Sequence, residues 1–463
     1  MPSDFNDLTT PGRPSWHRWD PIVTTTLFHW FTPTDGNLSG HWTPMEGREN
    51  WTGEKAFWVA QIKQIMRANI DLVYVHLINR FEQQRVNFFA ALHELRKQGW
   101  DVPKVAPFLD PFGIWPPAKL DVSSREGKDD IAALYIRWFQ QYFDANPDPL
   151  AETCLARIDQ KQVLLMWWAY SIWEDLPSLR KDDIETRLRC ALEHRTTNFN
   201  HGIHMVSTAL IDPDIEFADE RVVMFSGFSY CMQSTHNTVH SYHLQGGYWD
   251  QNIRRPGFFL PRAGGRHYRN AWEYVLSCVP VHRLYVESWN EYDEGSGIFA
   301  ADPSGPANRA PDLPGDVWSS TGDPFEYIKI TADGAARFNK LPESDARVIA
   351  HNLPPSMLPG ETRNVRVVVR NDGNGLWNEA RQTAFGLRPE SGFGAAGAPV
   401  VDAHHECELY GGVFRGRPVN LRFRITAPET PGEYRTVWSM RHGDSDWFGQ
   451  ALELPIIVSR QVP

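Results

Sequence analysis

The stretch that decides the fold is Tyr285-Val286-Glu287-Ser288-Trp289-Asn290-Glu291-Tyr292-Asp293-Glu294-Gly295. The short, β-rich run at residues 281–286 is typical of a buried strand. The chain then turns polar and acidic, and Gly295 stops any regular continuation. Carboxylates directly after a strand are typical of the catalytic face of a (β/α)8 barrel, where the loops that follow the strands meet.

Glu291 and Glu294 lie three positions apart in this stretch. If the turn is helical, their Cβ atoms are about 5–6 Å apart on one side. Such a pair suits the cleavage of a glycosidic bond, in which one group protonates the leaving oxygen and the other handles a second proton or the anomeric carbon. A solvated acidic turn is the alternative, but it would not need the flanking aromatic rings. We therefore predict that Glu291 and Glu294 are catalytic and that Trp289, Asn290 and Tyr292 bind substrate.

The composition is that of a globular protein and bears on which kinds of partner it can bind. With 463 residues, 41% hydrophobic and 22% charged, the chain can form more than one globular domain with a large core. The aromatic content of 13%, including 19 tryptophans, is high, and such rings commonly cover the apolar faces of sugars. A net charge of −11 argues against nucleic acid as a partner. We see no apolar run long enough to span a membrane.

The N-terminus and the cysteines bear on the compartment. Residues 1–7 lack the basic and apolar regions of a signal peptide, so we expect a cytoplasmic protein unless a leader has been removed. The five cysteines are scattered, odd in number and without C-x-x-C spacing. They indicate individual buried thiols rather than a disulfide framework.

Predicted strands and helices alternate through the first 340 residues. This alternation predicts a parallel sheet, and about eight units fit a (β/α)8 barrel. A doubly wound sheet is the competing topology, but its Gly-rich turn after the first strand is absent. The expected strands are 22–30, 70–78, 104–109, 162–170, 203–210, 222–230, 257–261 and 281–286, and the expected helices are 54–69, 80–99, 129–145, 183–195, 267–276 and 324–340.

The pattern changes after a short linker at residues 341–345. Short strands separated by turn signals follow, without a helical period, which predicts a β-sandwich of about 100 residues. We therefore expect two domains, a barrel at 1–340 and a sandwich at 346–463. The expected strands of the second domain are 365–369, 383–387, 419–425, 434–440 and 451–458.

Further candidate site residues follow the predicted strands, whose carboxyl ends share one face of a barrel. We predict substrate contacts from His29, Trp30, Asp110, Trp168, Tyr170, Trp173 and His236. The alternatives are core positions for His29 and Trp30, and a turn cap for Asp110. His236, His240 and His243 have a spacing that suggests a metal, but the glutamate of H-E-x-x-H is absent, so we expect none. Glu287, inside a strand, needs a partner such as Arg283, or belongs to the site.

The segment Trp289-Asn290-Glu291-Tyr292-Asp293-Glu294-Gly295 resembles the W-N-E-W-x-E-G signature of the glycoside hydrolase family 99 endo-mannosidases and their WbsX-like bacterial relatives. It is also similar to the W-N-D-Y-x-E-S of the family 71 fungal α-1,3-glucanases. The resemblance implies that Glu291 deprotonates the sugar 2-hydroxyl, whose oxygen displaces the leaving group to form a 1,2-anhydro sugar. It implies that Glu294 is the general acid and then the base, with the raised pKa. It implies no metal and no cofactor.

The C-terminal part resembles the four-tryptophan immunoglobulin-like domain found in autophagy receptors and fused to bacterial enzymes. The resemblance implies a sandwich that binds or packs rather than catalyses. The residues that carry it are Asn374-Gly375-x-Trp377, Pro431-Gly432-x-Tyr434, Trp438 and Trp447-Phe448-Gly449.

These expectations combine into one hypothesis. We expect a retaining (β/α)8 glycosidase that acts on an oligo- or polysaccharide without a cofactor, followed by an immunoglobulin-like sandwich. Two alternatives stay open. One is a WbsX-like enzyme that transfers glycosyl groups in polysaccharide assembly, and the other is a barrel that binds carbohydrate without catalysis.

Overall fold

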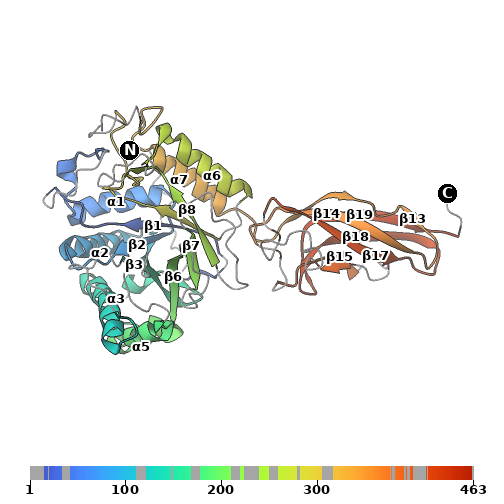
Figure 1. Ribbon diagram of the computed structural model, residues 1–463, viewed down its shortest axis with the longest axis horizontal. Coiled ribbons are helices and arrows are strands. Elements are labelled where there is room, and N and C mark those ends of the chain that lie inside the picture. The colour runs from blue at the N-terminus through green and yellow to red at the C-terminus, as the bar shows by residue number, and fades with distance from the viewer. Residues whose placement is uncertain are drawn as a thin grey trace. The chain divides into compact units, whose positions relative to one another are not determined.

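The chain forms two compact units, which we describe separately (Figure 1). Unit 1 comprises most of residues 1–339, and unit 2 comprises residues 340–463 with the short segments 231–237 and 274–282. No helix among the described residues is long and apolar enough to cross a membrane. This computed structural model describes residues 15–460 except 19, 34–41, 111–120, 148–149, 168–177, 210–218, 224–238, 250–258, 279–281, 305–315, 376, 378–380, 390–392, 394–396, 400–412 and 414.

Eight parallel strands form the centre of unit 1. Each pairs in parallel with two others, and the pairings run in the order β1-β2-β3-β5-β6-β7-β8-β11 and return from β11 to β1. The prediction of an α/β arrangement with parallel strands is therefore confirmed. The strands are β1 (Ile22–Leu27), β2 (Leu72–His76), β3 (Lys104–Leu109), β5 (Lys161–Met166), β6 (Ile203–Ala209), β7 (Glu220–Val223), β8 (Val239–Gln245) and β11 (Arg283–Glu287).

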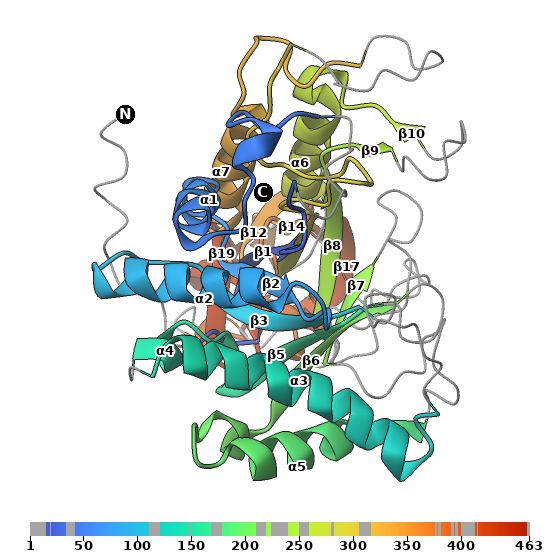
Figure 2. The same cartoon turned by 90° about the vertical axis from the view of Figure 1, so that its left-hand side faces the viewer.

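Helices cover the outside of these strands, as Figure 2 shows for α1, α2 and α3. Their apolar faces explain the packing: α1 buries Trp58, Ile62 and Ile65, which recur at helical spacing. Helix α3 begins at a serine cap, because the Oγ of Ser124 accepts the Gly127 N–H at 3.0 Å. The helices are α1 (Lys55–Arg67), α2 (Glu82–Lys97), α3 (Arg125–Ala145), α4 (Leu150–Thr153), α5 (Lys181–Leu192), α6 (Arg266–Cys278) and α7 (Glu326–Phe338).

The prediction of the seventh strand is wrong. Phe259–Leu260 forms β10, which pairs antiparallel with β9 (Tyr248–Trp249) outside the parallel set. Strand β8 (Val239–Gln245) lies instead in a polar stretch between two of the expected strands, where we predicted no strand. Its polar side chains are buried because they have partners: Ser241 donates to Glu220, and His243 contacts Glu287. Short β4 (Arg157–Ile158), which pairs antiparallel with β5, was also not predicted.

A buried polar cluster occupies the amino-terminal ends of the strands, away from the loop after β11. Glu220 accepts hydrogen bonds from Arg283 Nε at 3.2 Å and from Ser241 Oγ at 2.6 Å, and lies 3.3 Å from His204. Arg283 therefore pairs with Glu220 and not with Glu287. The charge of Arg283 and the bonds of His204 and Ser241 hold the pKa of Glu220 below its usual value despite burial.

Unit 2 consists of two sheets around one apolar core. From Ala346 onward, the elements whose bounds the structure describes are strands. The buried cluster draws on both sheets through Val367, Leu421, Phe385 and Trp438. One sheet has the order β12-β14-β17 and the other β13-β19-β18-β15-β16. The strands are β12 (Ala346–His351), β13 (Ser356–Met357), β14 (Thr362–Asn371), β15 (Ala384–Leu387), β16 (Gly397–Pro399), β17 (Pro418–Thr426), β18 (Gly432–His442) and β19 (Asp446–Val458).

Candidate active site

The acidic loop after β11 is a tight turn rather than a helical one. The Gly295 N–H donates to the Tyr292 carbonyl at 3.3 Å, and Gly295 has φ 61°, which a glycine adopts without strain. Glu291 comes just before this turn, and its N–H donates to Ser288 Oγ at 2.6 Å. Glu294 therefore lies in a turn and Glu291 just before it, and the helical arrangement that would place both on one side is not formed.

The side chains of Trp289 and Asn290 hold the start of this loop in place through hydrogen bonds. Both side chains are fully buried. The Trp289 indole donates to Gln61 Oε1 on α1 at 3.0 Å, and its main-chain N–H donates to the Thr26 carbonyl at 2.8 Å. The Asn290 amide accepts the Phe28 N–H at 2.8 Å and donates to the Phe28 carbonyl at 2.6 Å. In this structure these two side chains position Glu291 and have no surface for a ligand.

Arg262 supports the other end of the loop. Its Nη2 donates to the carbonyls of Gly295 at 2.7 Å and Gly297 at 2.6 Å. The guanidinium is buried and lies 4.2 Å from the ring centroid of Trp318 and 4.6 Å from that of Tyr327, within cation–π range. Sequence reasoning missed Arg262 because no pattern connects an isolated arginine to a loop more than thirty residues away.

Glu291 is the electrostatic centre of the site. Its side chain is half-buried. Burial raises its pKa well above the usual value, and the negative charges of Glu294, Asp293, Glu287 and Asp110 raise it further, in that order. A raised pKa is therefore found at Glu291, and the raised pKa that the resemblance implies for Glu294 stays a prediction. A carboxylate in this environment holds its proton to higher pH and is a stronger base when it loses it.

Glu287 belongs to this group of carboxylates and has its own partners. It is 9% exposed, and its Oε2 contacts His243 Nε2 on β8 and accepts a 3.3 Å hydrogen bond from Gln245 Nε2. The His243 ring also stacks on Tyr285, with centroids 5.7 Å apart. His243 thus compensates a carboxylate inside the parallel strands that would otherwise be costly to bury.

Asp110 lies near a second histidine that the sequence did not reveal. His76 Nε2, at the end of β2, is 3.6 Å from Asp110 Oδ2. His76 Nδ1 accepts the Ile78 N–H at 2.9 Å, so a neutral His76 carries its proton on Nε2, facing Asp110. Burial lowers the pKa of His76, and Asp110 opposes this shift. Because the charge of Asp110 also acts on Glu291, it lies in the same electrostatic neighbourhood, as its position after β3 predicted.

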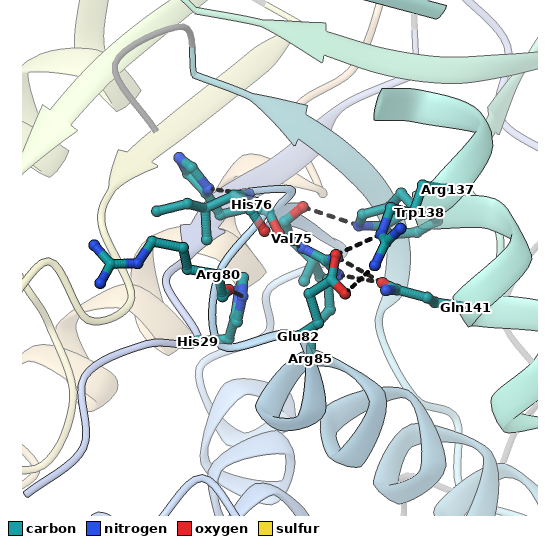
Figure 3. Close-up of polar contacts among 10 residues, drawn as sticks. His29, Val75, His76, Arg80, Glu82, Arg85, Arg137, Trp138 and Gln141 are labelled. Carbon is teal, nitrogen blue, oxygen red and sulfur yellow. Dashed lines mark hydrogen bonds and ion pairs between the residues drawn. The ribbon is translucent and has the colours of Figure 1, made fainter. Parts of the chain in front are cut away.

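Buried Arg85 hydrogen-bonds the end of β2 at His76 and the loop that follows it before α2 (Figure 3). Arg85 donates to the carbonyls of His76 at 3.3 Å and Ile78 at 2.9 Å, and to Gln141 Oε1. His29 is fully buried, and its Nε2 lies 3.3 Å from the Arg80 carbonyl. Burial lowers the pKa of His29 well below its usual value. In this structure His29 therefore contacts the main chain of this loop at Arg80, and its buried side chain has no surface for a ligand.

Two partly exposed aromatic rings offer faces for a sugar. Trp30, after β1, packs edge-on against His76 with centroids 4.6 Å apart. Trp167, after β5, lies 5.3 Å from Tyr285, and we did not predict it. Tyr292, by contrast, is 2% exposed, and burial raises its pKa to about 12. Four predicted contacts lie outside the described residues: Trp168, Tyr170, Trp173 and His236.

Among the described residues, no group of three or more histidine, cysteine, aspartate or glutamate side chains is arranged to hold a metal ion. What the site brings together is a set of carboxylates, two histidines that contact them, and two partly exposed rings. This set can move protons and pack against a ring-shaped ligand.

Comparison with known proteins adds likenesses of fold. No family model and no curated protein matches the sequence. The family 99 endo-α-mannosidase of Bacteroides thetaiotaomicron is 17% identical, with 69% of this chain and 98% of that chain covered and a TM-score of 0.49. A glycoside hydrolase-like protein is 14% identical, with 71% and 98% covered and a TM-score of 0.46. Both TM-scores are below 0.5, so neither likeness carries the function proposed below.

Proposed function

We propose that unit 1 is a (β/α)8 glycosidase that cleaves a glycosidic bond in an oligo- or polysaccharide. The observation that carries this proposal is the convergence of four carboxylates on Glu291 at the carboxyl end of β11. Acid–base cleavage of a glycoside needs a carboxylate whose pKa is displaced toward neutral pH. The parallel pairings that return to β1 support the barrel, whose catalytic groups lie at the carboxyl ends of the strands.

The roles of the two glutamates follow from their surroundings and from the resemblance. Glu291 takes the proton of the sugar 2-hydroxyl, and that oxygen bonds to the anomeric carbon as the bond to the leaving oxygen breaks. Glu294 gives its proton to the leaving oxygen. Water then opens the anhydro sugar, with its proton passing to Glu294 while Glu291 returns the first proton to the 2-oxygen, so both groups end as they began. Trp30 and Trp167 supply ring faces for the sugar.

Release of reducing sugar from a panel of neutral and acidic polysaccharides tests this proposal. The wild-type protein should release product from at least one of them, and Glu291→Gln and Glu294→Gln should release it about 10²–10⁴-fold more slowly. Product that forms only when a sugar nucleotide is supplied would identify a transferase. Binding without any product, under all conditions, would identify a carbohydrate-binding barrel.

We also propose that residues 1–340 and 346–463 are separate domains and that the second is an immunoglobulin-like sandwich. The change from alternating helices and strands to strands alone, near residue 340, supports this division. A chain that ends at Lys340 should be soluble and keep activity on short substrates. If it is wholly insoluble, the two parts share a core and the boundary is wrong.

A further inference from the structure

Five arginines lie on one face of the three-stranded sheet in unit 2. Side chains alternate along a strand, so the residues of β14 and β17 between the buried valines and leucines all point to the other face. Four of the five are exposed, and Arg370 is partly exposed. Residues 340–463 contain equal numbers of acidic and basic side chains, so this concentration is local. We call this surface the arginine face; its members are Arg347, Arg366, Arg370, Arg422 and Arg424.

Like charges are placed directly opposite each other on this face. Arg366 pairs across the strands with Arg422, and Arg347 pairs with Arg370. Directly opposed side chains have Cβ atoms about 4.5–5.5 Å apart, and like charges there destabilise a sheet. The second pair is relieved by Asp372, whose carboxylate lies 3.2 Å from Arg347 and 2.5 Å from Arg370.

The first pair has no such relief in the part of the chain that the structure describes. Arg366 donates to Asn420 Oδ1 at 2.7 Å, which orients its guanidinium without neutralising it. Neither Arg422 nor Arg424 forms an ion pair with a described carboxylate. Among the described residues, three guanidinium groups are therefore presented without a carboxylate partner, and the repulsion within the directly opposed pair Arg366 and Arg422 opposes the pairing of β14 with β17.

Protection of sheet edges does not account for this arrangement. Charged residues on edge strands prevent sheets from pairing with one another, and β12 and β17 are the edges here. Arg366 and Arg370, however, lie on the central strand β14, where no edge needs protection. A destabilising charge that a fold retains without a structural need is typical of a binding surface.

We propose that the arginine face binds an acidic polysaccharide, one that carries carboxylate or sulfate groups. The planar, always-charged guanidinium is suited to both groups, and a sheet face with repeated charges fits an extended polymer better than a single small anion. The choice of a polysaccharide among polyanions rests on the function proposed for unit 1. On that basis the second unit holds the enzyme on an acidic glycan.

Affinity electrophoresis of the full-length protein tests this inference. The probes are polygalacturonate and dextran sulfate, with neutral dextran as the blank, and mixed-sequence duplex DNA and phosphatidylserine vesicles as other polyanions. The test variant is Arg422→Gln/Arg424→Gln. The matched control is Arg435→Gln/Arg460→Gln, which removes the same charge from exposed positions elsewhere in unit 2.

The test variant should bind an acidic polysaccharide about tenfold more weakly, and the salt dependence of binding should fall by about one counterion for each arginine removed. The control should bind like the wild type. The melting temperature of Arg422→Gln should not fall, because its repulsion with Arg366 is removed. This result would separate lost binding from lost folding.

Three results would overturn the inference: no binding to either acidic polysaccharide, equal weakening in the control, or tighter binding to DNA or vesicles. Reducing-sugar release from a short neutral oligosaccharide is measured in parallel. Activity kept while polyanion binding is absent would remove only this inference. Binding kept in a protein without any activity would remove only the function proposed for unit 1.

Discussion

The side-chain amide of Asn290 is hydrogen-bonded in both directions to the main chain of Phe28. It thereby replaces, for one residue, the strand pairing that would otherwise continue β11 alongside β1. The consequence is that Glu291, the next residue, enters the acidic loop at a fixed point. Only an amide can do this, because it carries a donor and an acceptor side by side.

Asn290→Ala should destabilise the protein and lower its activity together. The change leaves a buried N–H and a buried carbonyl of Phe28 without partners, which costs about 1–3 kcal/mol for each group. Thermal unfolding and kcat on the best substrate of the panel measure the two effects. Asn364→Ala, at an exposed position of β14, is the control and should change neither. An Asn290→Ala protein that melts and turns over like the wild type would contradict the proposed role.

Arg262→Lys tests the support at the far end of the acidic loop. Lysine keeps the charge but lacks the planar guanidinium that packs over Trp318 and Tyr327, so its ammonium is not held in the place from which Nη2 donates to the carbonyls of Gly295 and Gly297. A displacement of about 1 Å in catalytic groups can lower the rate about 100-fold, and we expect kcat to fall toward this limit with little change in KM. Arg266→Lys, exposed at the start of α6, should be neutral. If Arg262→Lys only lowers the melting temperature and leaves kcat unchanged, Arg262 has no positioning role.

The raised pKa of Glu291 predicts how stability depends on pH. Its carboxyl group is protonated more readily in the folded than in the unfolded protein. Its contribution to the free energy of unfolding is therefore fully present below the unfolded pKa, about 4.3, and is lost as pH rises through the higher folded pKa. Glutamine keeps the shape without the charge. Glu291→Gln should therefore melt at a higher temperature than the wild type above that window, and the difference should shrink as pH falls toward 4. A difference in melting temperature that does not vary with pH would show that ionisation of Glu291 does not destabilise the folded protein.

The alternation of helices and strands was predictable because each βα unit buries apolar residues at a regular period. Helix α1 shows this in Trp58, Ile62 and Ile65. Strand β8 was not predictable by the same rule, because its buried Ser241 and His243 are polar and satisfied by partners on other strands. Polar residues bury at a low cost only when such partners exist, and a single sequence does not show them.

Some residues of the candidate site could likewise be predicted from the sequence, and others could not. Glu291 and Glu294 could be proposed from a local stretch, since their chemistry and their spacing are both in the sequence. His76 and Arg262 could not, because each acts through a neighbour that is distant in the chain. The sequence also overstated the aromatic contacts. Trp289, which the sequence predicts to bind substrate, has a buried ring whose indole N–H donates to Gln61.

The last prediction separates the roles of the two glutamates. Glu291→Gln and Glu294→Gln should each lower kcat by about 10²–10⁴-fold, as the loss of a general base or acid does. A substrate whose leaving group is already a weak base, such as a dinitrophenolate, needs no proton when the bond breaks. It should restore much of the kcat of Glu294→Gln and none of that of Glu291→Gln, because the 2-hydroxyl must still be deprotonated. In the wild type, activity should rise with pH through the raised pKa of Glu291. Equal rescue of both variants would show that the roles are assigned wrongly, and a variant with full activity would show that the site lies elsewhere.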